Sequence, residues 1–434
     1  MCAYTYGSGA FKSTDYKYRT GAFLTRYKLI DLFCGCGGIS RGFQKTGHFD
    51  VEYGVELEHH PAQTFTRNIR NSLGRPTPVF ERDIEELVAS DRVFWDHLKP
   101  TGIEQAAQID VLVGGPPCQG FSRNGVRQYI ASGIRFYDDP RNHLYKAFLL
   151  AVEMLRPTVL LIENVREFLN FGEGKFSDDL LTRLDELGYV TDFRKICAAD
   201  YGVPQMRHRV FFLGISKDIY RASKNPLPFP QPTFSSTGVQ LGLLQDFQYR
   251  TVRDAISDLP APVYEHGQAT PYSHSSKPSE YAAYMRSPTG KVYNHVARTL
   301  SETSKARIRA VGTGRMKHIE KPLRTNSFYG SAYRRLEWDE PALTITTWVY
   351  HVGSGRFAHP SEDRGITMRE AARLQSFDDD FIFPDLINPV SQMIGNAVPP
   401  LLATRFAESI AAYLDRARQH SSAIPQSNRL STAA

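Results

Sequence analysis

The sequence predicts an α/β protein with a mostly parallel sheet, joined to a smaller irregular domain. Short apolar runs alternate with helical patterns over about two hundred residues, which is typical of strands and helices that build a parallel sheet. A glycine-rich turn at residues 35–38 directly follows the first apolar run. A Pro-rich connection at residues 225–232 then ends the regular pattern, because proline sustains neither a helix interior nor a central strand.

The strands of the expected sheet are short apolar runs bounded by polar or turn residues. We expect these strands at residues 27–33, 51–55, 111–113, 159–162 and 210–214. A helical stretch at residues 144–152 precedes the strand expected at 159–162.

The region after the Pro-rich connection is rich in Gly, Ser, Thr, Arg and aromatic residues through about residue 360. Beyond it we expect a helix at residues 367–375 and a closing helix at 399–413, whose Pro-Pro start suits a first helical turn. The expected domains are a flexible arm at 1–27, a large domain at 28–222 completed by 391–416, a second domain at 223–365, a helix and connection at 366–390, and a disordered tail at 417–434.

The composition is that of a globular protein. Of 434 residues, 41% are apolar and 23% are charged. No apolar run reaches the roughly 20 residues that cross a bilayer, and the first residues lack a secretory signal pattern. The five cysteines lack paired Cys-x-x-Cys spacing, so we expect no disulfide framework, no metal, and reduced thiols in the cytoplasm.

Charge is unevenly distributed along the chain. Residues 286–335 contain 12 Lys and Arg against only Glu302 and Glu320, a local net charge of +10, while the whole chain carries +6. One basic segment on a mildly acidic body is the pattern of a protein that contacts a phosphate backbone. A solvated surface loop would show the same pattern, and charge alone does not separate the two.

The glycine-rich turn and an acidic residue after it indicate a nucleotide-like ligand. A tight turn between strand and helix lets the backbone approach a ligand. Glu56 follows Gly38 by eighteen residues, near the offset of about 20 at which a carboxylate reaches a ribose hydroxyl pair. NAD, FAD and S-adenosylmethionine domains all share this pattern, and so does a purely structural turn. Asp83 and Ile84 are weaker candidates for an adenine contact.

Cys118 is the candidate nucleophile. It follows two glycines and two prolines, Gly114 to Pro117, at the carboxyl end of an expected strand, where open α/β sheets place their ligands. A cysteine in such a rigid turn is accessible, and its thiolate can act as a nucleophile. A buried packing cysteine belongs more often inside a strand or helix. Cys34 and Cys36 read as small turn residues.

Six segments in chain order resemble the cytosine-5 DNA methyltransferase family. The matches are the glycine loop at 31–38, the nucleophile loop at 115–122, Glu163-Asn164-Val165 after a strand, Gln205-x-Arg207-x-Arg209, the helix at 369–375 and Gly395-Asn396-Ala397-Val398. Cys36 fills a variable loop position, and Leu57 stands where an aromatic residue often contacts the adenine of the cofactor. The second departure puts that one contact in doubt.

The resemblance implies a Rossmann-like methyltransferase domain, a target-recognition domain at 223–365, and methylation of a cytosine in double-stranded DNA. It implies S-adenosylmethionine as cofactor and a monomer. The cofactor residues it implies, together with those inferred above, are Phe33, Gly35, Gly37, Gly38, Glu56, Leu57, Asp83, Ile84, Pro117, Asn396 and Val398. The DNA contacts expected are Ser122, Arg123, Gln205, Arg298, Arg334 and Arg335.

The chemistry of cytosine assigns roles to four residues. Carbon 5 is too weak a nucleophile to take a methyl group until a thiolate, Cys118, adds at carbon 6. Glu163 is expected beside ring N3, with a raised pKa that lets it donate a proton. We expect Arg207 to contact the cytosine carbonyl and orient Glu163, and Arg209 to hold the thiolate environment or a phosphate. Because carbon 5 is shielded in a duplex, the base must be flipped out, and residues 120–137 suit a loop that closes over it.

Other classes of protein account for less of the sequence. The tRNA-modifying branch of the family departs from Gln-Gly-Phe-Ser in its nucleophile loop and has a small recognition domain. Amino-group methyltransferases carry an aromatic residue after Pro-Pro, and a nicotinamide oxidoreductase leaves Cys118 unexplained. A non-enzymatic regulator would lack Cys118 or Glu163. A cognate restriction endonuclease that acts separately fits the sequence, and so does a solitary methyltransferase; the target site is not encoded in any motif.

Overall fold

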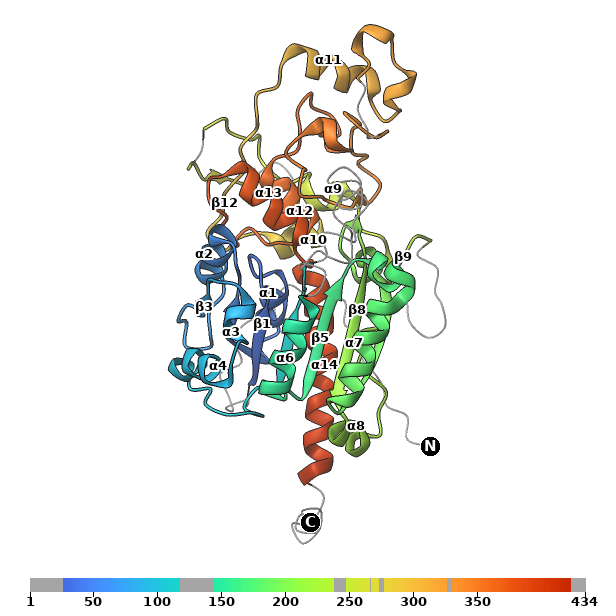
Figure 1. Ribbon diagram of the computed structural model, residues 1–434. Helices are drawn as coiled ribbons and strands as arrows, with labels where there is room; N and C mark the ends of the chain where they lie inside the picture. Colours follow the sequence, from blue (N-terminus) through green and yellow to red (C-terminus); the bar gives the residue numbers. More distant parts are fainter. Residues whose placement is uncertain are drawn as a thin grey trace, which may run out of the picture.

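The structure is a computed structural model that describes residues 26–117, 144–237, 247–265, 267–272, 277–325 and 330–422. It has two lobes (Figure 1), a lower α/β lobe built around one sheet and an upper lobe formed mainly by residues 250–390. Within the described residues, no helix is long and apolar enough to cross a membrane.

The large sheet has seven strands in the order β3-β2-β1-β4-β5-β8-β6. The strands β3, β2, β1, β4 and β5 are parallel, whereas β8 runs antiparallel to both of its neighbours. The sheet is therefore mostly parallel, as the sequence predicts. Its strands are β1 Tyr27–Leu32, β2 Phe49–Val55, β3 Val79–Phe80, β4 Val111–Gly114, β5 Val159–Asn164, β6 Tyr189–Cys197 and β8 His208–Ser216.

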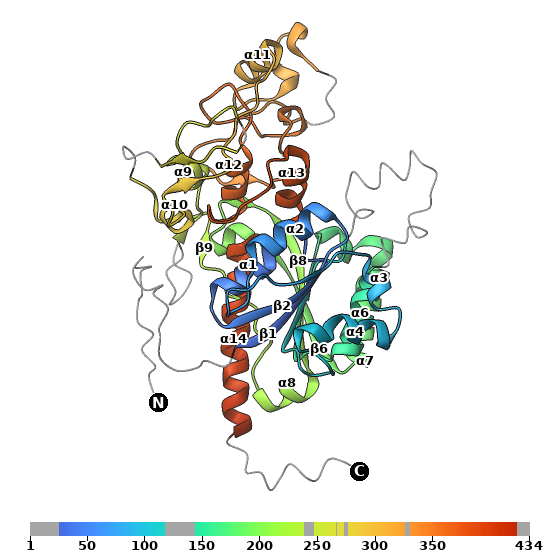
Figure 2. The same cartoon turned by 90° about the vertical axis from the view of Figure 1, so that its left-hand side faces the viewer.

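Helices cover both faces of this sheet (Figure 2). On one face, α1 (Gly38–Lys45) and α14 (Pro400–Ser422) pack together; on the other lie α3 (Ile84–Leu87), α4 (Asp91–Leu98), α6 (Tyr145–Leu155) and α7 (Lys175–Glu186). Alternate residues of each buried strand enter the two cores: Leu29 packs on the α1 side and Ile30 on the α6 side. The α2 (His59–Asn68) and α8 (Lys217–Ser223) helices follow β2 and β8.

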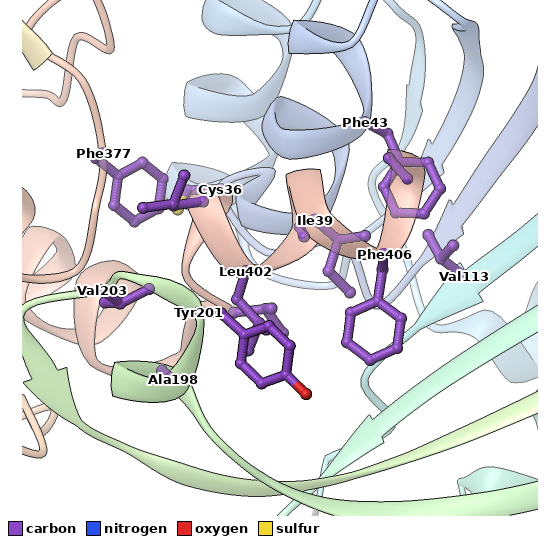
Figure 3. Packing of buried hydrophobic residues seen from close by; sticks show 14 of the residues in the cluster. Cys36, Ile39, Phe43, Val113, Ala198, Tyr201, Val203, Phe377, Leu402 and Phe406 are labelled. Atoms are coloured by element: carbon purple, nitrogen blue, oxygen red, sulfur yellow. The ribbon is translucent and has the colours of Figure 1, made fainter. Parts of the chain in front are cut away.

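The core on the α1 side joins distant parts of the chain. Figure 3 shows Ile39 and Phe43 of α1 beside Phe406 of α14, with Val113 of β4 next to them. Cys36 points into the same cluster near Phe377, and burial raises the pKa of its thiol well above the ordinary value. Burial also raises the pKa of the Cys34 thiol, so both cysteines of the glycine loop are packing residues.

The upper lobe is only partly a separate domain. Its first helices, α9 (Val252–Ile256) and α10 (Glu280–Met285), contribute buried residues to the core that lies on the α1 side of the sheet. A smaller core of its own forms around α11 (Glu302–Val311) from Ile308, Val311, Met316, Ile319, Ala332, Tyr333, Val352 and Ala358. The remaining elements are β7 Gln205–Met206, β9 Phe234–Ser235, β10 Phe247–Gln248, β11 Thr270–Pro271, β12 Lys291–Val292 and β13 Ala342–Leu343.

Two helices lie between the lobes, α12 (Met368–Leu374) and α13 (Ile387–Asn396). The first begins with a capping box in which Thr367 and Glu370 satisfy each other's backbone N–H groups, which stabilises the helix start. It matches the helix expected at 367–375. The second was not expected, because its first turn contains Pro389, yet proline is tolerated there.

Some expected boundaries are wrong. The strand expected at 159–162 continues to Asn164, so Glu163 lies inside β5 and not after it. The closing helix continues to Ser422, which contradicts a disordered tail that begins at 417. Ala417 is buried, and Arg418 lies over the ring of Tyr27 and bonds to Asp110, which explains the longer helix. Residues 1–25 and 423–434, which include nearly all of the expected arm, lie outside the described residues.

Candidate active site

The glycine loop after β1 has a backbone conformation that favours glycine. Gly35 and Gly37 have φ angles of +54° and +96°, and Phe33 also has a positive φ, of +56°. A left-handed conformation is strained at a residue other than glycine, and such strain concentrates at functional sites. A Cβ on Gly35 would meet no atom within 4 Å, whereas one on Gly37 would lie 2.9 Å from atoms of Phe65 and Ile69. The loop is therefore open on the side of Gly35, where a ligand can approach its backbone.

Glu56 joins the ends of β1 and β2. Its carboxylate accepts hydrogen bonds from the backbone N–H groups of Gly35 and Glu58, each 2.9 Å long. Burial raises the pKa of this carboxyl above its ordinary value. A carboxylate held beside the open face of a glycine loop is placed to accept the hydroxyl groups of a ribose.

Asp31 is the first residue of the loop matched at 31–38, but no role of its own was predicted for it from the sequence. It lies in β1 with 1% of its surface exposed, and its Oδ2 accepts a hydrogen bond of 2.6 Å from Ser40. Its Oδ1 is buried and has no hydrogen-bond partner among the described residues. Burial raises the pKa of this carboxyl to about 7. An acidic residue within an apolar strand run was the available signal, because a buried carboxylate is costly unless a partner compensates it.

Cofactor residues expected from the two ends of the chain lie together. A Cβ on Gly38 would come within 2.4 Å of the carbonyl oxygen of Val398, so the two backbones are in direct contact. One turn further along α1, a Cβ on Gly42 would lie 2.4 Å from the carbonyl oxygen of Pro400. Asn396 is exposed at the end of α13, next to this contact. The segment at 396–398 thus closes one side of the glycine loop.

The remaining expected cofactor residues are arranged less uniformly. Leu57 is 60% exposed next to Glu56, and Pro117 is half-buried beyond the end of β4. Asp83 caps α3, because its Oδ1 accepts the backbone N–H of Glu85 at 2.9 Å. Ile84 is 3% exposed and packs in the core, and its expected adenine contact stays a prediction.

The described part of the nucleophile loop lies against β5. Cys118, with the neighbouring Ser122 and Arg123, lies outside the described residues, which resume at 144. Up to Pro117 the loop is anchored, since Asn164 Nδ2 donates a hydrogen bond of 3.3 Å to the Pro116 carbonyl. A Cβ on Gly115 would lie 3.2 Å from Glu163 Oε2. The backbone that leads to Cys118 is therefore in contact with the Glu163 carboxylate.

Glu163 is paired with Arg209. Arg209 Nε lies 2.9 Å from Glu163 Oε1, and the two side chains are 19% and 12% exposed. The antiparallel pairing of β5 with β8 explains the contact, because Glu163 stands opposite Phe211, two residues from Arg209. A guanidinium so placed orients the carboxylate and stabilises negative charge next to it. The pair leaves one carboxylate oxygen, Oε2, on the side of the nucleophile loop.

The expectation that Arg207 orients Glu163 is wrong, whereas the contacts expected with cytosine, the thiolate or a phosphate stay predictions. Arg209, and not Arg207, contacts Glu163. Arg207 is 1% exposed, and its guanidinium donates to the backbone carbonyls of Ile345 at 3.2 Å and Gly395 at 2.9 Å. Side chains two apart on a strand face the same side, so Arg207 and Arg209 were expected to lie together. Arg207, however, lies just before β8, at the junction of the two lobes. Its position supports the frame around the site.

Gln205 is not a DNA contact, contrary to our expectation. It is 0% exposed, and its Nε2 donates to Leu374 and Gln375 of the α12 segment. Its Oε1 accepts the backbone N–H of Ile345 at 2.8 Å. All of these bonds are internal, so Gln205 joins β7, the helix α12 and the 345 segment.

The arginines expected to contact DNA differ in availability. Arg335 is paired with Asp363 and bonds to the carbonyls of His359 and Glu362, and its side chain is 13% exposed, so its expected role is wrong. Arg334 pairs with Glu337 at 3.1 Å. Arg298 is exposed and donates to the carbonyl of Tyr350.

Among the other exposed cations of the basic segment are Arg315, Lys317 and Lys321. In the described part of the chain, none of them pairs with an acidic side chain. They lie next to Met316 and Ile319 of the small core, which holds the backbone between them. Each of them is therefore available to a phosphate.

Comparison with known proteins identifies close relatives among bacterial enzymes. The chain is 31% identical over 396 residues to the type II methyltransferase M1.HphI of Haemophilus parahaemolyticus, covering 89% of both chains. It is 32% identical to the type II methyltransferase M.AgeI of Thalassovita gelatinovora, covering 88% of this chain and 99% of the relative.

Solved structures of similar fold include a putative DNA modification methyltransferase encoded within an Escherichia coli prophage. It superimposes with a TM-score of 0.66 at 25% identity, and the alignment covers 90% of this chain and 99% of that one. The Dnmt2 methyltransferase of S. pombe shares the fold, with a TM-score of 0.52 at 13% identity over 90% of this chain. The sequence profile described as C-5 cytosine-specific DNA methylase matches residues 27–412. The chain thus belongs to the C-5 cytosine-specific DNA methylase family and is a DNA (cytosine-5)-methyltransferase.

Proposed function

We propose that this enzyme transfers a methyl group from S-adenosylmethionine to carbon 5 of one cytosine within a specific double-stranded DNA sequence, through a covalent bond to Cys118. The observation that supports this best is the Glu163–Arg209 pair, 2.9 Å apart, in contact with the backbone of Gly115. In this proposal the Cys118 thiol would act beside this carboxyl group and guanidinium, at the carboxyl ends of β4 and β5, where open α/β sheets bind their ligands.

The residues around the glycine loop fit S-adenosylmethionine. Glu56 faces the loop as a ribose acceptor, and the open side of Gly35 admits the chain of a ligand. The buried Oδ1 of Asp31 has no hydrogen-bond partner among the described residues, which favours a cationic ligand group, such as an ammonium, nearby. The cofactor supplies an electrophilic methyl group on sulfur.

Cys118 and Glu163 would share the work of activating the ring. The Cys118 thiolate adds to carbon 6, and the electron pair released toward N3 is met by the proton of Glu163. Arg209, paired with Glu163, would hold this carboxyl group in place. After carbon 5 has accepted the methyl group, loss of its proton to water or hydroxide and departure of the thiolate restore the aromatic ring.

The DNA must deliver the base to this site outside the helix stack. Carbon 5 is enclosed in a duplex, so we infer that the cytosine is flipped out and that residues 120–137 close over it. Exposed Arg298, Arg315, Lys317 and Lys321 would hold the backbone through phosphate contacts. The relatives are named type II methyltransferases, which supports a role as the modification partner of a separate restriction endonuclease, or as a solitary enzyme of the same specificity type.

A mechanism-based trap tests the proposal. Duplex DNA in which 5-fluorocytosine replaces cytosine should give a complex that survives denaturing electrophoresis, because fluorine cannot leave carbon 5 as a proton. Cys118→Ser should form no such complex and transfer no methyl group, yet still bind the cofactor in calorimetry. Cys197→Ala, which changes a buried cysteine in β6, is the matched control and should form the adduct.

The opposite results would refute it. Methyl transfer by Cys118→Ser, or an active wild-type enzyme that forms no adduct, contradicts covalent catalysis. Transfer to tRNA in preference to duplex DNA contradicts the substrate. Methylome sequencing of an expressing host identifies the target cytosine, and a methylated position other than carbon 5 would refute the reaction itself.

A further inference from the structure

The upper lobe carries an exposed pair of aromatic rings on a rigid turn. Trp348 is 55% exposed, while the next residue, Val349, is 1% exposed and packs in the large core. Val352 is buried in the separate small core around α11. The turn at 347–350 is thus fixed in the large core through Val349 and followed two residues later by an anchor in the small core, while Trp348 is exposed. A large aromatic side chain exposed on a fixed backbone serves binding better than it serves packing.

The exposed rings are stacked and are accompanied by a cation. The rings of Trp348 and Tyr350 are stacked at 5.7 Å between centroids and 27° between planes. The Arg298 guanidinium lies 5.5 Å from the Tyr350 ring and donates a hydrogen bond of 3.1 Å to the Tyr350 carbonyl. We call these three residues the Trp348 platform. Two aligned rings beside an arginine form the kind of surface on which nucleobases stack.

The backbone of this platform is tied to the active-site frame. The carbonyl of Thr347 accepts a hydrogen bond of 2.7 Å from Ser391 of α13. A Cβ on Gly395 would lie 2.4 Å from the Thr347 backbone nitrogen, so the turn and the end of α13 are in contact. Arg207 bonds to both Ile345 and Gly395. The platform therefore follows directly, in the chain, the segment that Arg207 joins to the catalytic lobe.

We propose that Trp348 stacks on a base of the bound DNA that has lost a stacking neighbour when the target cytosine leaves the helix. This inference rests on the proposed function and adds to it a contact in the recognition lobe. Extrusion of a base breaks its stacking with both neighbours, and an aromatic ring that fills the exposed face recovers part of that loss. The basic segment at 286–335, with its local charge of +10, favours a polyanion over a second copy of this chain as the occupant.

Substitution of Trp348 tests this contact by kinetics. Trp348→Ala should raise the KM for unmethylated genomic DNA and lower kcat/KM by about tenfold or more, which is the scale of one lost base–aromatic stack. Trp348→Phe keeps a ring and should retain most of the activity. The affinity for S-adenosylmethionine should not change in either variant. Phe247→Ala is the matched control, because Phe247 is equally exposed at 55% but lies in β10, outside this turn.

Tryptophan fluorescence tests the contact without catalysis. The chain has three tryptophans, and Trp95 and Trp338 are only partly exposed. Duplex DNA should quench the emission of the wild type, and most of this quenching should be absent in Trp348→Phe. Quenching that persists unchanged in Trp348→Phe would overturn the inference.

Equal kcat/KM for Trp348→Ala and the wild type would also overturn it, whereas a wild type that does not methylate DNA at all would refute the proposed function. Concentration-dependent self-association that disappears in Trp348→Ala, with normal DNA kinetics, would assign the platform to a dimer contact and refute a DNA contact.

Discussion

Arg41 and Asp378 form a two-pronged ion pair between the cofactor helix and the segment after α12. Arg41 Nη2 lies 3.0 Å from Oδ1 and 2.9 Å from Oδ2 of Asp378, and Lys45, one turn further along α1, lies 2.5 Å from Oδ2. Since α1 begins at the glycine loop, the pair connects the cofactor loop to the helix that separates the lobes. Asp378 is almost completely buried, so the contact is shielded from water.

Removal of the Asp378 charge should destabilise the protein. Asp378→Asn leaves two cations facing a neutral group in a buried place, and loss of one partner of such a pair costs about 3 kcal/mol. The free energy of unfolding, measured in urea, should fall by roughly that amount. Asp380→Asn removes an exposed carboxylate two residues away and serves as the control. Equal stability of the two variants would mean that the ion pair contributes nothing.

Two buried carboxyl groups, Asp378 and Glu370, should make the free energy of unfolding decrease at low pH. Burial alone would raise the pKa of Asp378, but the charges of Lys45 and Arg41 hold it well below its ordinary value. Burial likewise opposes ionisation of Glu370, but bonds to Arg364 lower its pKa to about 2. A carboxyl with a depressed pKa stabilises the fold above its unfolded value, near 4, and loses this contribution as pH falls toward the folded value. Urea midpoints should therefore fall steeply below pH 4, and less steeply in Asp378→Asn; parallel curves would contradict this.

Asp31 should show the opposite dependence. Its pKa is raised by burial to about 7, so its folded-state contribution is fully present below the unfolded pKa near 4 and is lost as pH rises through 7. Asp31→Asn should remove this loss and make the cofactor-free protein relatively more stable at pH 8. If Asp31 supports a cationic group of the cofactor, the same variant should bind S-adenosylmethionine more weakly in calorimetry. Tighter or unchanged binding would exclude that role.

Substitution of Arg209 should mainly lower kcat, whereas substitution of Arg207 should mainly lower the melting temperature. Arg209→Gln removes the partner of Glu163 on a half-buried side chain, so kcat should fall by at least about a hundredfold while the melting temperature changes little. Arg207→Gln removes bonds to Ile345 and Gly395 and should lower the melting temperature first. Single-turnover kinetics and thermal unfolding of both variants separate these effects. A stable, inactive Arg207→Gln would instead place Arg207 in the chemistry.

Gly395 should not tolerate a side chain. A Cβ there would lie 2.4 Å from the Thr347 nitrogen and 2.5 Å from the Thr346 carbonyl carbon, both backbone atoms that cannot move aside cheaply. Gly395→Ala should separate the 346–347 segment from α13, lower stability, and weaken DNA binding more than cofactor binding. Gly330→Ala, where a Cβ meets nothing within 4 Å, is the control. Wild-type behaviour of Gly395→Ala would show that the two segments can part without effect.

Much of the fold follows from local sequence signals. Apolar runs such as 159–162 and the glycine turn at 35–38 have recognisable sequence patterns, so the mostly parallel sheet was predicted. The order of motifs also brought Gly38 and Val398 into one expected site, and the structure places them in contact. These features depend on strand periodicity and on turns, which neighbouring residues determine.

The different contacts of the polar side chains were not predictable in this way. Gln205, Arg207 and Arg209 are all long polar residues spaced by two, but they differ in burial. Gln205 bonds to α12 and Arg207 bonds to the 345 segment, each more than a hundred residues away. The Arg335 guanidinium likewise forms an ion pair with Asp363. Such pairings depend on long-range packing, which a spacing of two residues does not reveal.

The contact between Gly38 and Val398 has a consequence for synthesis of the enzyme. The glycine loop emerges from the ribosome early, but the segment that closes its side, and the α14 helix that packs on α1, are made more than 350 residues later. A nascent chain that stops before residue 398 has the nucleophile and its carboxylate partner but an unfinished cofactor cradle. We therefore expect partial translation products that end before residue 398 to lack methylating activity, so that only chains translated past this segment would modify DNA.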